Sequence, residues 1–193
     1  MLIVAMLLAI ALEQAPPSTS AILTEVRALL EQPQTPERMA RIEAGLLAVS
    51  DREDRYPDLP TLATRLPMHI EMLERYRAAG DRAGVRRHAR FLMAAERWVD
   101  PTDWAALPDA RPRASNRTSV DERRAIRARH ATAFVTGRID FANAVLADGD
   151  RAKAIWWLET GERLLADIPG AVKALRAERD RLRKGGPPRL RSG

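Results

Sequence analysis

The chain has 193 residues, with 32 basic and 26 acidic side chains, a formal net charge of +6 and no cysteine. Without cysteine, a disulfide scaffold, a thiolate zinc site, a cysteine nucleophile and covalently attached haem are excluded. Ala, Leu and Arg, which favour helices, greatly outnumber Val, Ile and Thr, which favour strands. The composition therefore predicts an all-α protein.

The chain begins with an apolar segment. Residues 1–12 are apolar without interruption, which is shorter than the roughly 20 residues of a membrane span but within the roughly 7–15 residues of a secretory signal. Small residues at Ala9, Ala11 and Ala15 offer cleavage points, although no Lys or Arg precedes the segment. We therefore predict that residues 1–15 are a signal peptide and that the protein is exported, to the periplasm or the envelope. The alternatives are a hydrophobic N-terminal helix in a cytoplasmic protein, or a wrongly assigned start codon.

Helical periodicity follows a proline-containing linker. Apolar residues recur every three or four positions, and this spacing predicts four helices, over residues 22–30, 36–49, 62–79 and 82–98. The first two are separated by a short break around Pro33 and form a helical hairpin. A kink or a short break is expected at Pro67, and Gly80-Asp81 is expected to end the third helix and cap the fourth.

The second half starts with a long loop at residues 100–118, a candidate hinge. The capping box at 119–122 then predicts a long helix to residue 145, with Gly137 as its weak point. Two more helices are expected, over 151–165 and 171–184. The whole pattern indicates about seven helices in stacked antiparallel hairpins, as a superhelix or an irregular bundle. Residues 16–184 would form a single domain, followed by a basic flexible tail at 185–193.

Two of the expected hairpins carry a motif of small and large residues around a Gly-Asp turn. In the later hairpin the positions are Phe141-Ala142, Val145, Gly149-Asp150, Ala154, Leu158 and Gly161; in the earlier one they are Tyr76, Gly80-Asp81, Val85, Ala89 and Leu92. Small residues let two helices approach while large ones fill the groove between them. The motif resembles the tetratricopeptide repeat over about a third of the chain. The resemblance implies a protein-interaction scaffold that binds an extended segment or a helix in a concave groove.

Groups that carry catalysis are sparse. The three histidines, His69, His88 and His130, are dispersed and have no zinc-binding spacing. We expect His69 and His130 to be core residues and His88, among arginines, to be solvated. Phosphate-binding glycine loops and nucleophile-elbow motifs are absent from the sequence. No catalytic, cofactor-binding or metal-ligating residue is therefore predicted, and no cofactor.

Charge is uneven along the chain and suggests a binding surface. The first 80 residues are net acidic, and the remainder carries the positive charge. Arg82, Arg86 and Arg90 recur at every fourth position, as a basic stripe on one helix. Trp156 points away from the apolar stripe of its own helix, so it either packs on a neighbouring hairpin or is an exposed interface anchor. With Tyr76, these residues are the predicted partner-binding set.

The sequence thus favours a non-enzymatic interaction or scaffold module that binds a protein partner, acidic in character, through a helical groove. An anionic membrane surface could use the same arginines. A cytoplasmic nucleic-acid-binding protein that uses its arginine stripes is the alternative function, less favoured because of the expected signal peptide. Many arginines also have acidic neighbours, so an ordinary solvated surface is a further interpretation of the stripes.

Overall fold

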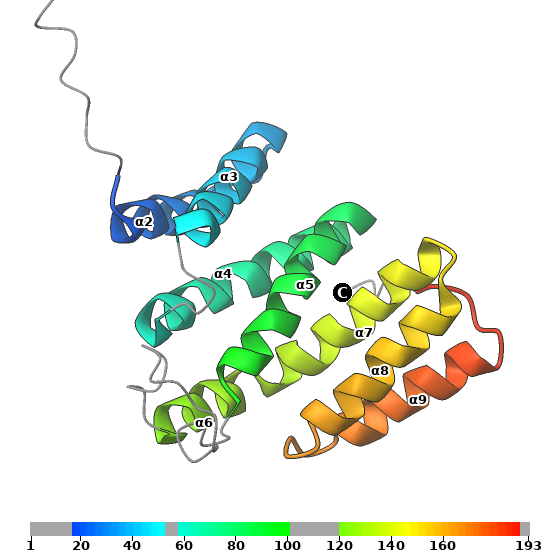
Figure 1. Ribbon diagram of the computed structural model, residues 1–193. Helices are drawn as coiled ribbons and strands as arrows, with labels where there is room; N and C mark the ends of the chain where they lie inside the picture. The colour runs from blue at the N-terminus through cyan, green and yellow to red at the C-terminus, as the bar shows by residue number, and fades with distance from the viewer. Residues whose placement is uncertain (1–16, 53–57, 101–119, 190–193) are drawn as a thin grey trace, which may run out of the picture. The chain divides into compact units, whose positions relative to one another are not determined.

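A computed structural model describes residues 17–52, 58–100 and 120–189 of the chain. These residues form eight α-helices and no strand, which confirms the all-α prediction. The helices are α2 (Thr19–Leu30), α3 (Pro36–Arg52), α4 (Leu59–Ala78), α5 (Arg82–Trp98), α6 (Val120–Arg129), α7 (Ala131–Ala147), α8 (Arg151–Leu164) and α9 (Ala171–Arg183) (Figure 1). Three parts of the sequence prediction lie outside the described residues: the signal peptide at residues 1–15, the loop at 100–118 except for its first residue, and Ser119.

The chain divides into two compact units, residues 1–53 and 54–193, where the sequence had suggested one domain over 16–184. The first unit holds the α2–α3 hairpin. Ser18 caps α2 by accepting a hydrogen bond from the amide of Ala21 at 3.2 Å. The two helices are held together by an apolar core of Ile22, Leu23, Val26, Leu29, Leu30, Ile42, Leu46 and Val49.

The second unit is a row of helices in which each packs on the next. Helix α4 packs on α5, α5 on α7, α7 on α8, and α8 on α9, and α7 also contacts α9 (Figure 1). Helix α7 therefore lies inside the row, and every residue from Gly137 to Leu146 is buried. Both Gly-Asp turns form as expected, because Gly80 and Gly149 adopt positive φ angles of 69° and 92° that favour glycine.

Two details of the helices differ from the sequence prediction. The helix expected over 119–145 breaks at His130, not at Gly137, so the described residues form eight helices where about seven were expected. Gly137 instead lies where a Cβ atom would come within 2.8 Å of Leu92 Cδ1, so glycine allows α5 and α7 to approach closely. Helix α4 continues through Pro67 without the short break that was one of the two alternatives there.

Candidate functional site

A row of exposed arginines on α5 is the most distinctive surface feature of the second unit. Arg82, Arg86 and Arg90 are all exposed, as the stripe predicts, and Arg97 extends the row by two further turns. Arg97 was not among the predicted residues, although it lies seven residues after Arg90 and therefore on the same helix face. We call these four residues the arginine row. The opposite face of α5 is buried against α4 and α7, and this packing holds the helix that carries the arginine row in place.

Few carboxylates neutralise the arginine row. Arg86 forms an ion pair with Asp148 at the end of α7, and both side chains are about half exposed. Within the part of the chain that the structure describes, Arg82, Arg90 and Arg97 form no ion pair. Since exposed ion pairs contribute only about 0–1 kcal/mol, even Arg86 is available to another anion.

Tyr76 does not lie at this surface. It is 9% exposed and is covered by Gly84, where any Cβ atom would collide with the tyrosine ring. Its ring stacks on His88 with a centroid distance of 5.5 Å, and the guanidinium of Arg87 lies 5.6 Å from the centre of the Tyr76 ring. Tyr76 is therefore a core contact between α4 and α5, which removes it from a partner-binding surface.

The same interface buries two histidines that face each other. His69 and His88 are 6% and 4% exposed, and their Nδ1 atoms lie 3.0 Å apart. The core position predicted for His69 is confirmed, but the solvated position predicted for His88 is wrong. His88 points toward α4, away from the arginines that flank it in the sequence. The His69 ring also stacks on Phe91, over which Arg65 places its guanidinium at 4.8 Å.

The electrostatic surroundings keep His69 neutral. Burial lowers the pKa of His69 well below its ordinary value, and the neighbouring His88 and Arg65 lower it further. A short contact between two Nδ1 atoms requires a single proton, donated by one ring to the lone pair of the other. The two rings therefore form one hydrogen bond between α4 and α5, with His69 in its neutral form. His130 is half-buried, and burial followed by the charge of Arg129 lowers its pKa too.

Trp156 is exposed, the second of the two alternatives that the sequence left open. Its side chain is 48% exposed on α8, and it stands edge-on to the half-buried Trp157 with a centroid distance of 4.6 Å. Trp157 in turn meets the edge of Phe141 on α7 at 5.4 Å. These ring contacts hold Trp156 in place, and none of those among the described residues involves the arginine row. Trp156 is thus a separate, preorganised aromatic surface.

Many other charged residues lie in the core, which the sequence did not reveal. Arg138 and Glu96 are 0% and 1% exposed and form an ion pair between α7 and α5, with Arg138 Nε donating to Glu96 Oε2 at 3.2 Å. Arg138 Nη1 also donates to the carbonyl of Trp157 at 3.0 Å. Burial lowers the pKa of Arg138 to about 10, so it remains charged at neutral pH.

The arginines of α6 are divided between core and surface. Arg123 and Arg127 are 5% and 4% exposed, while Arg124 pairs with Asp121 at the surface. Arg127 donates to Asp167 at 2.6 Å and to the carbonyl of Glu96 at 3.2 Å. Bonding with Arg127 lowers the pKa of Asp167 against the opposing effect of its partial burial. Arg123 and Arg127 are therefore structural residues, while Arg124 and Arg129 lie at the surface.

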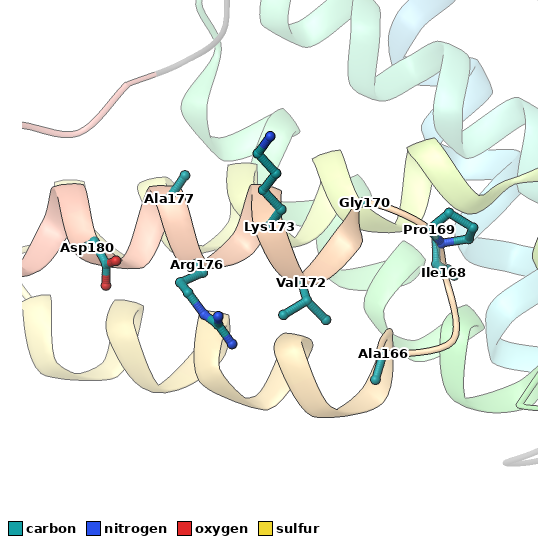
Figure 2. Close-up of a pocket in the computed structure, with 9 residues that line it drawn as sticks. All are labelled: Ala166, Ile168, Pro169, Gly170, Val172, Lys173, Arg176, Ala177 and Asp180. Atoms are coloured by element: carbon teal, nitrogen blue, oxygen red, sulfur yellow. The ribbon is translucent and has the colours of Figure 1, made fainter.

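An open groove lies along the outer side of α9 and the turn that precedes it (Figure 2). It measures about 610 Å³ and is lined by apolar residues of the 166–170 turn and by Val172, Lys173, Arg176 and Asp180 of α9. Its charged groups are of both signs. No cluster of three His, Cys, Asp or Glu side chains that could hold a metal ion occurs among the described residues.

Comparisons with known proteins identify no relative: no family model, no curated protein and no solved structure matches the chain. The resemblance to tetratricopeptide hairpins therefore stays a prediction. Among the described helices, none has the length and apolar character that crossing a membrane requires.

Proposed function

We propose that the chain is a non-enzymatic interaction module and that its arginine row binds an acidic segment of a protein partner. The row itself is the observation that supports this most: four exposed guanidinium groups over about 22 Å of one helix, at 1.5 Å per residue, with only Asp148 as a partner among the described residues. Guanidinium groups bind carboxylates with two parallel hydrogen bonds, so a row of them suits a segment rich in Asp or Glu.

Trp156 is proposed as a second contact surface. Exposed tryptophans supported by other rings are frequent anchors in protein interfaces. The predicted tetratricopeptide-like hairpins agree with a scaffold of this kind. Export from the cytoplasm is part of the proposal and is supported by the apolar residues 1–12. The mass of the mature N-terminus tests it: a chain that keeps Met1 when expressed in its native cell would contradict export.

Binding of a fluorescent poly-glutamate peptide, followed by fluorescence anisotropy, tests the arginine row. The variant with Arg82, Arg86 and Arg90 all changed to Glu should lose binding, since its attractive charges become repulsive. Its matched control changes the three lysines, Lys153, Lys173 and Lys184, to Glu and so alters the net charge equally. All three are exposed and lie on α8, on α9 or directly after it.

Three outcomes distinguish a specific site on α5, a general effect of net charge, and nucleic-acid binding. Loss of peptide binding in the arginine variant alone supports the proposed site. Equal loss in both variants would show that only net charge matters and would overturn the assignment to α5. A DNA duplex bound more tightly than poly-glutamate, with an affinity that falls steeply with salt, would overturn the acidic protein partner in favour of nucleic acid.

A further inference from the structure

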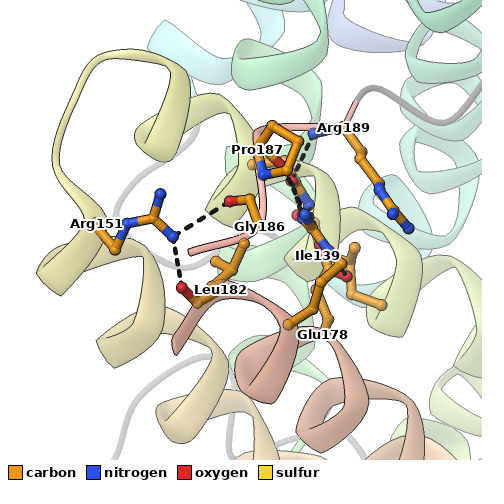
Figure 3. A network of polar contacts seen from close by, with 9 residues as sticks. Ile139, Arg151, Glu178, Leu182, Gly186, Pro187 and Arg189 are labelled. Atoms are coloured by element: carbon orange, nitrogen blue, oxygen red, sulfur yellow. Dashed lines mark hydrogen bonds and ion pairs between the residues drawn. The ribbon is translucent and has the colours of Figure 1, made fainter. Parts of the chain in front are cut away.

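The segment that follows α9 is held against the body of the second unit. Gly185 has a φ of 85° and turns the chain at the end of the helix, where the amide of Gly186 donates to the carbonyl of Arg181 at 3.0 Å. Residues 185–189 then run back along the unit (Figure 3). The sequence had suggested a flexible tail from residue 185, but residues 185–189 have defined partners.

Three side chains bind the backbone of this segment. Arg151 Nη1 donates to the carbonyl of Gly186 at 3.2 Å, and Arg181 Nη1 donates to the carbonyl of Pro187. The amide of Arg189 donates to Asn143 Oδ1 at 2.8 Å (Figure 3). The contacts come from α8, α9 and α7, so the segment lies where three helices meet.

Asn143 is fixed in the orientation that accepts this amide. It is 1% exposed, and its Nδ2 donates to the carbonyl of Ile139 at 3.0 Å and to Glu178 Oε1 at 2.6 Å. Its Oδ1 therefore faces the segment, where it also accepts from Arg181 Nη2 at 2.9 Å. We call Asn143, Arg151, Glu178 and Arg181 the Asn143 clamp.

Charge strengthens the Asn143 clamp. Burial raises the pKa of Glu178, but hydrogen bonds from Arg181 and Asn143 outweigh it, and the pKa is lowered overall. The bond to Glu178 in turn raises the pKa of Arg181. Both groups therefore stay ionised at neutral pH, and Arg181 presents a permanent charged donor to the segment.

The sequence of the segment matches what the Asn143 clamp can bind. Pro187 and Pro188 have no amide hydrogen, so between 186 and 189 only Gly186 and Arg189 need acceptors, and both have one. A Cβ atom on Gly186 would lie 2.8 Å from the carbonyl oxygen of Arg181, too close for any other residue. Glycine at 186 and two prolines without amide hydrogens therefore suit the segment to the clamp, and any residue can supply the amide at position 189.

We propose that the Asn143 clamp is a peptide-recognition site for extended Gly-Pro-Pro-X segments, and that residues 186–189 are its ligand within the chain. A partner protein with the same backbone pattern competes with the tail for the clamp. Because the tail is tethered, its effective concentration is in the millimolar range, so the site is filled by the tail until the partner is abundant or the tail is pulled away. This site is distinct from the arginine row and does not depend on its function.

The Gly186→Ala variant of the full chain tests the proposal, because its Cβ atom would collide with the carbonyl and side chain of Arg181 and release the tail, while the four residues of the Asn143 clamp keep their identity. In the unaltered protein the Arg189 amide should exchange with solvent on the order of 100-fold more slowly than in a free peptide, if each of the three hydrogen bonds between clamp and segment contributes about fivefold. Gly186→Ala should abolish this protection. Equal exchange in the protein and in the free peptide would overturn the docking of the tail.

Binding of a labelled peptide with the sequence of residues 185–193 tests recognition by the released clamp. Gly186→Ala should bind it about tenfold or more tightly than the unaltered protein, in which the tail competes. Adding Arg151→Met should weaken the binding, whereas Arg163→Met, at an exposed arginine on the same helix, should not. Asn143→Ser provides a second clamp variant, with its fold checked by circular dichroism. If Gly186→Ala does not bind the peptide, or if Arg151→Met and Arg163→Met behave alike, the peptide-recognition site is refuted.

Discussion

Removal of one member of the buried Glu96–Arg138 pair should be far more harmful than removal of both. The change Glu96→Leu leaves the guanidinium of Arg138 fully buried, with the carbonyl of Trp157 as its remaining described hydrogen-bond partner. An uncompensated buried charge of this kind costs about 3–5 kcal/mol. Typical domains are stable by only about 5–15 kcal/mol, so the second unit would lose much of its free energy of unfolding.

The double variant Glu96→Leu with Arg138→Met should recover most of this loss. Apolar residues of similar volume often replace a buried ion pair at little cost, because the expense of dehydrating both charges disappears. The carbonyl of Trp157 loses its donor, which costs about 1–3 kcal/mol. We therefore expect the double variant to be clearly more stable than either single variant. Its loss of unfolding free energy should be smaller than the sum of the two single losses by at least about 2 kcal/mol.

Urea unfolding followed by tryptophan fluorescence measures these differences. All four tryptophans follow residue 97, so the signal reports on the second unit alone. With a slope near 2 kcal/mol per molar, a loss of about 4 kcal/mol lowers the midpoint by about 2 M. Arg176→Met is the control and should change stability by less than about 1 kcal/mol, because Arg176 is exposed and its partner Glu162 keeps an ion pair with Arg179. Additive losses in the double variant would refute the reasoning.

Three further predictions concern the helical contacts. Stability should fall as the pH drops from 7 toward 5, because the pKa of His69 in the folded protein lies well below the value of about 6.5 that it has when unfolded, and the unfolded chain therefore takes up the proton first. The urea midpoints of the unaltered protein and of His69→Phe should diverge as the pH falls. Parallel pH curves for the two proteins would count against this role of His69. Gly161→Ala should destabilise by about 1–3 kcal/mol in thermal unfolding, because the new Cβ atom would collide with Arg138 Cδ, and a raised melting temperature would contradict this contact. Asp81→Ala should cost about 0.5–2 kcal/mol, since Asp81 accepts hydrogen bonds from two amides at the start of α5; circular dichroism melts showing no change would disprove that role.

Helices and turns could be predicted because their signals are local. The apolar spacing of Leu62, Leu66 and Leu73 identified the buried face of α4, and all three side chains are at most 1% exposed. The Gly-Asp turns were equally predictable, since glycine tolerates positive φ and aspartate caps the next helix. The exposed face of α5 followed from the same periodicity, so most of the arginine row was found.

The polar core could not be predicted because each of its residues depends on a partner far away in the sequence. Arg138 reads as a surface residue until Glu96, 42 positions earlier, is known to lie beside it. His88 was assigned to solvent from its arginine neighbours, whereas its actual contact is 19 positions away. The tail was expected to be flexible because glycine and proline favour loops, but Asn143, 46 positions from Arg189, binds it.

The polar residues of α7 also determine how this helix is aligned with its neighbours. Arg138 bonds to α5 and α8, Asp140 accepts from Arg77 of α4 at 2.7 Å, and Asn143 bonds to α9. A helix buried only through Ala, Val and Leu could slide by one turn, or rotate, and still cover an apolar surface. Sliding α7 would separate three buried polar groups from their partners at once, at several kcal/mol for each charge. The polar contacts of α7 therefore fix its position relative to α4, α5, α8 and α9. A one-residue insertion near the start of α7 would move Arg138, Asp140 and Asn143 away from their partners at the same time.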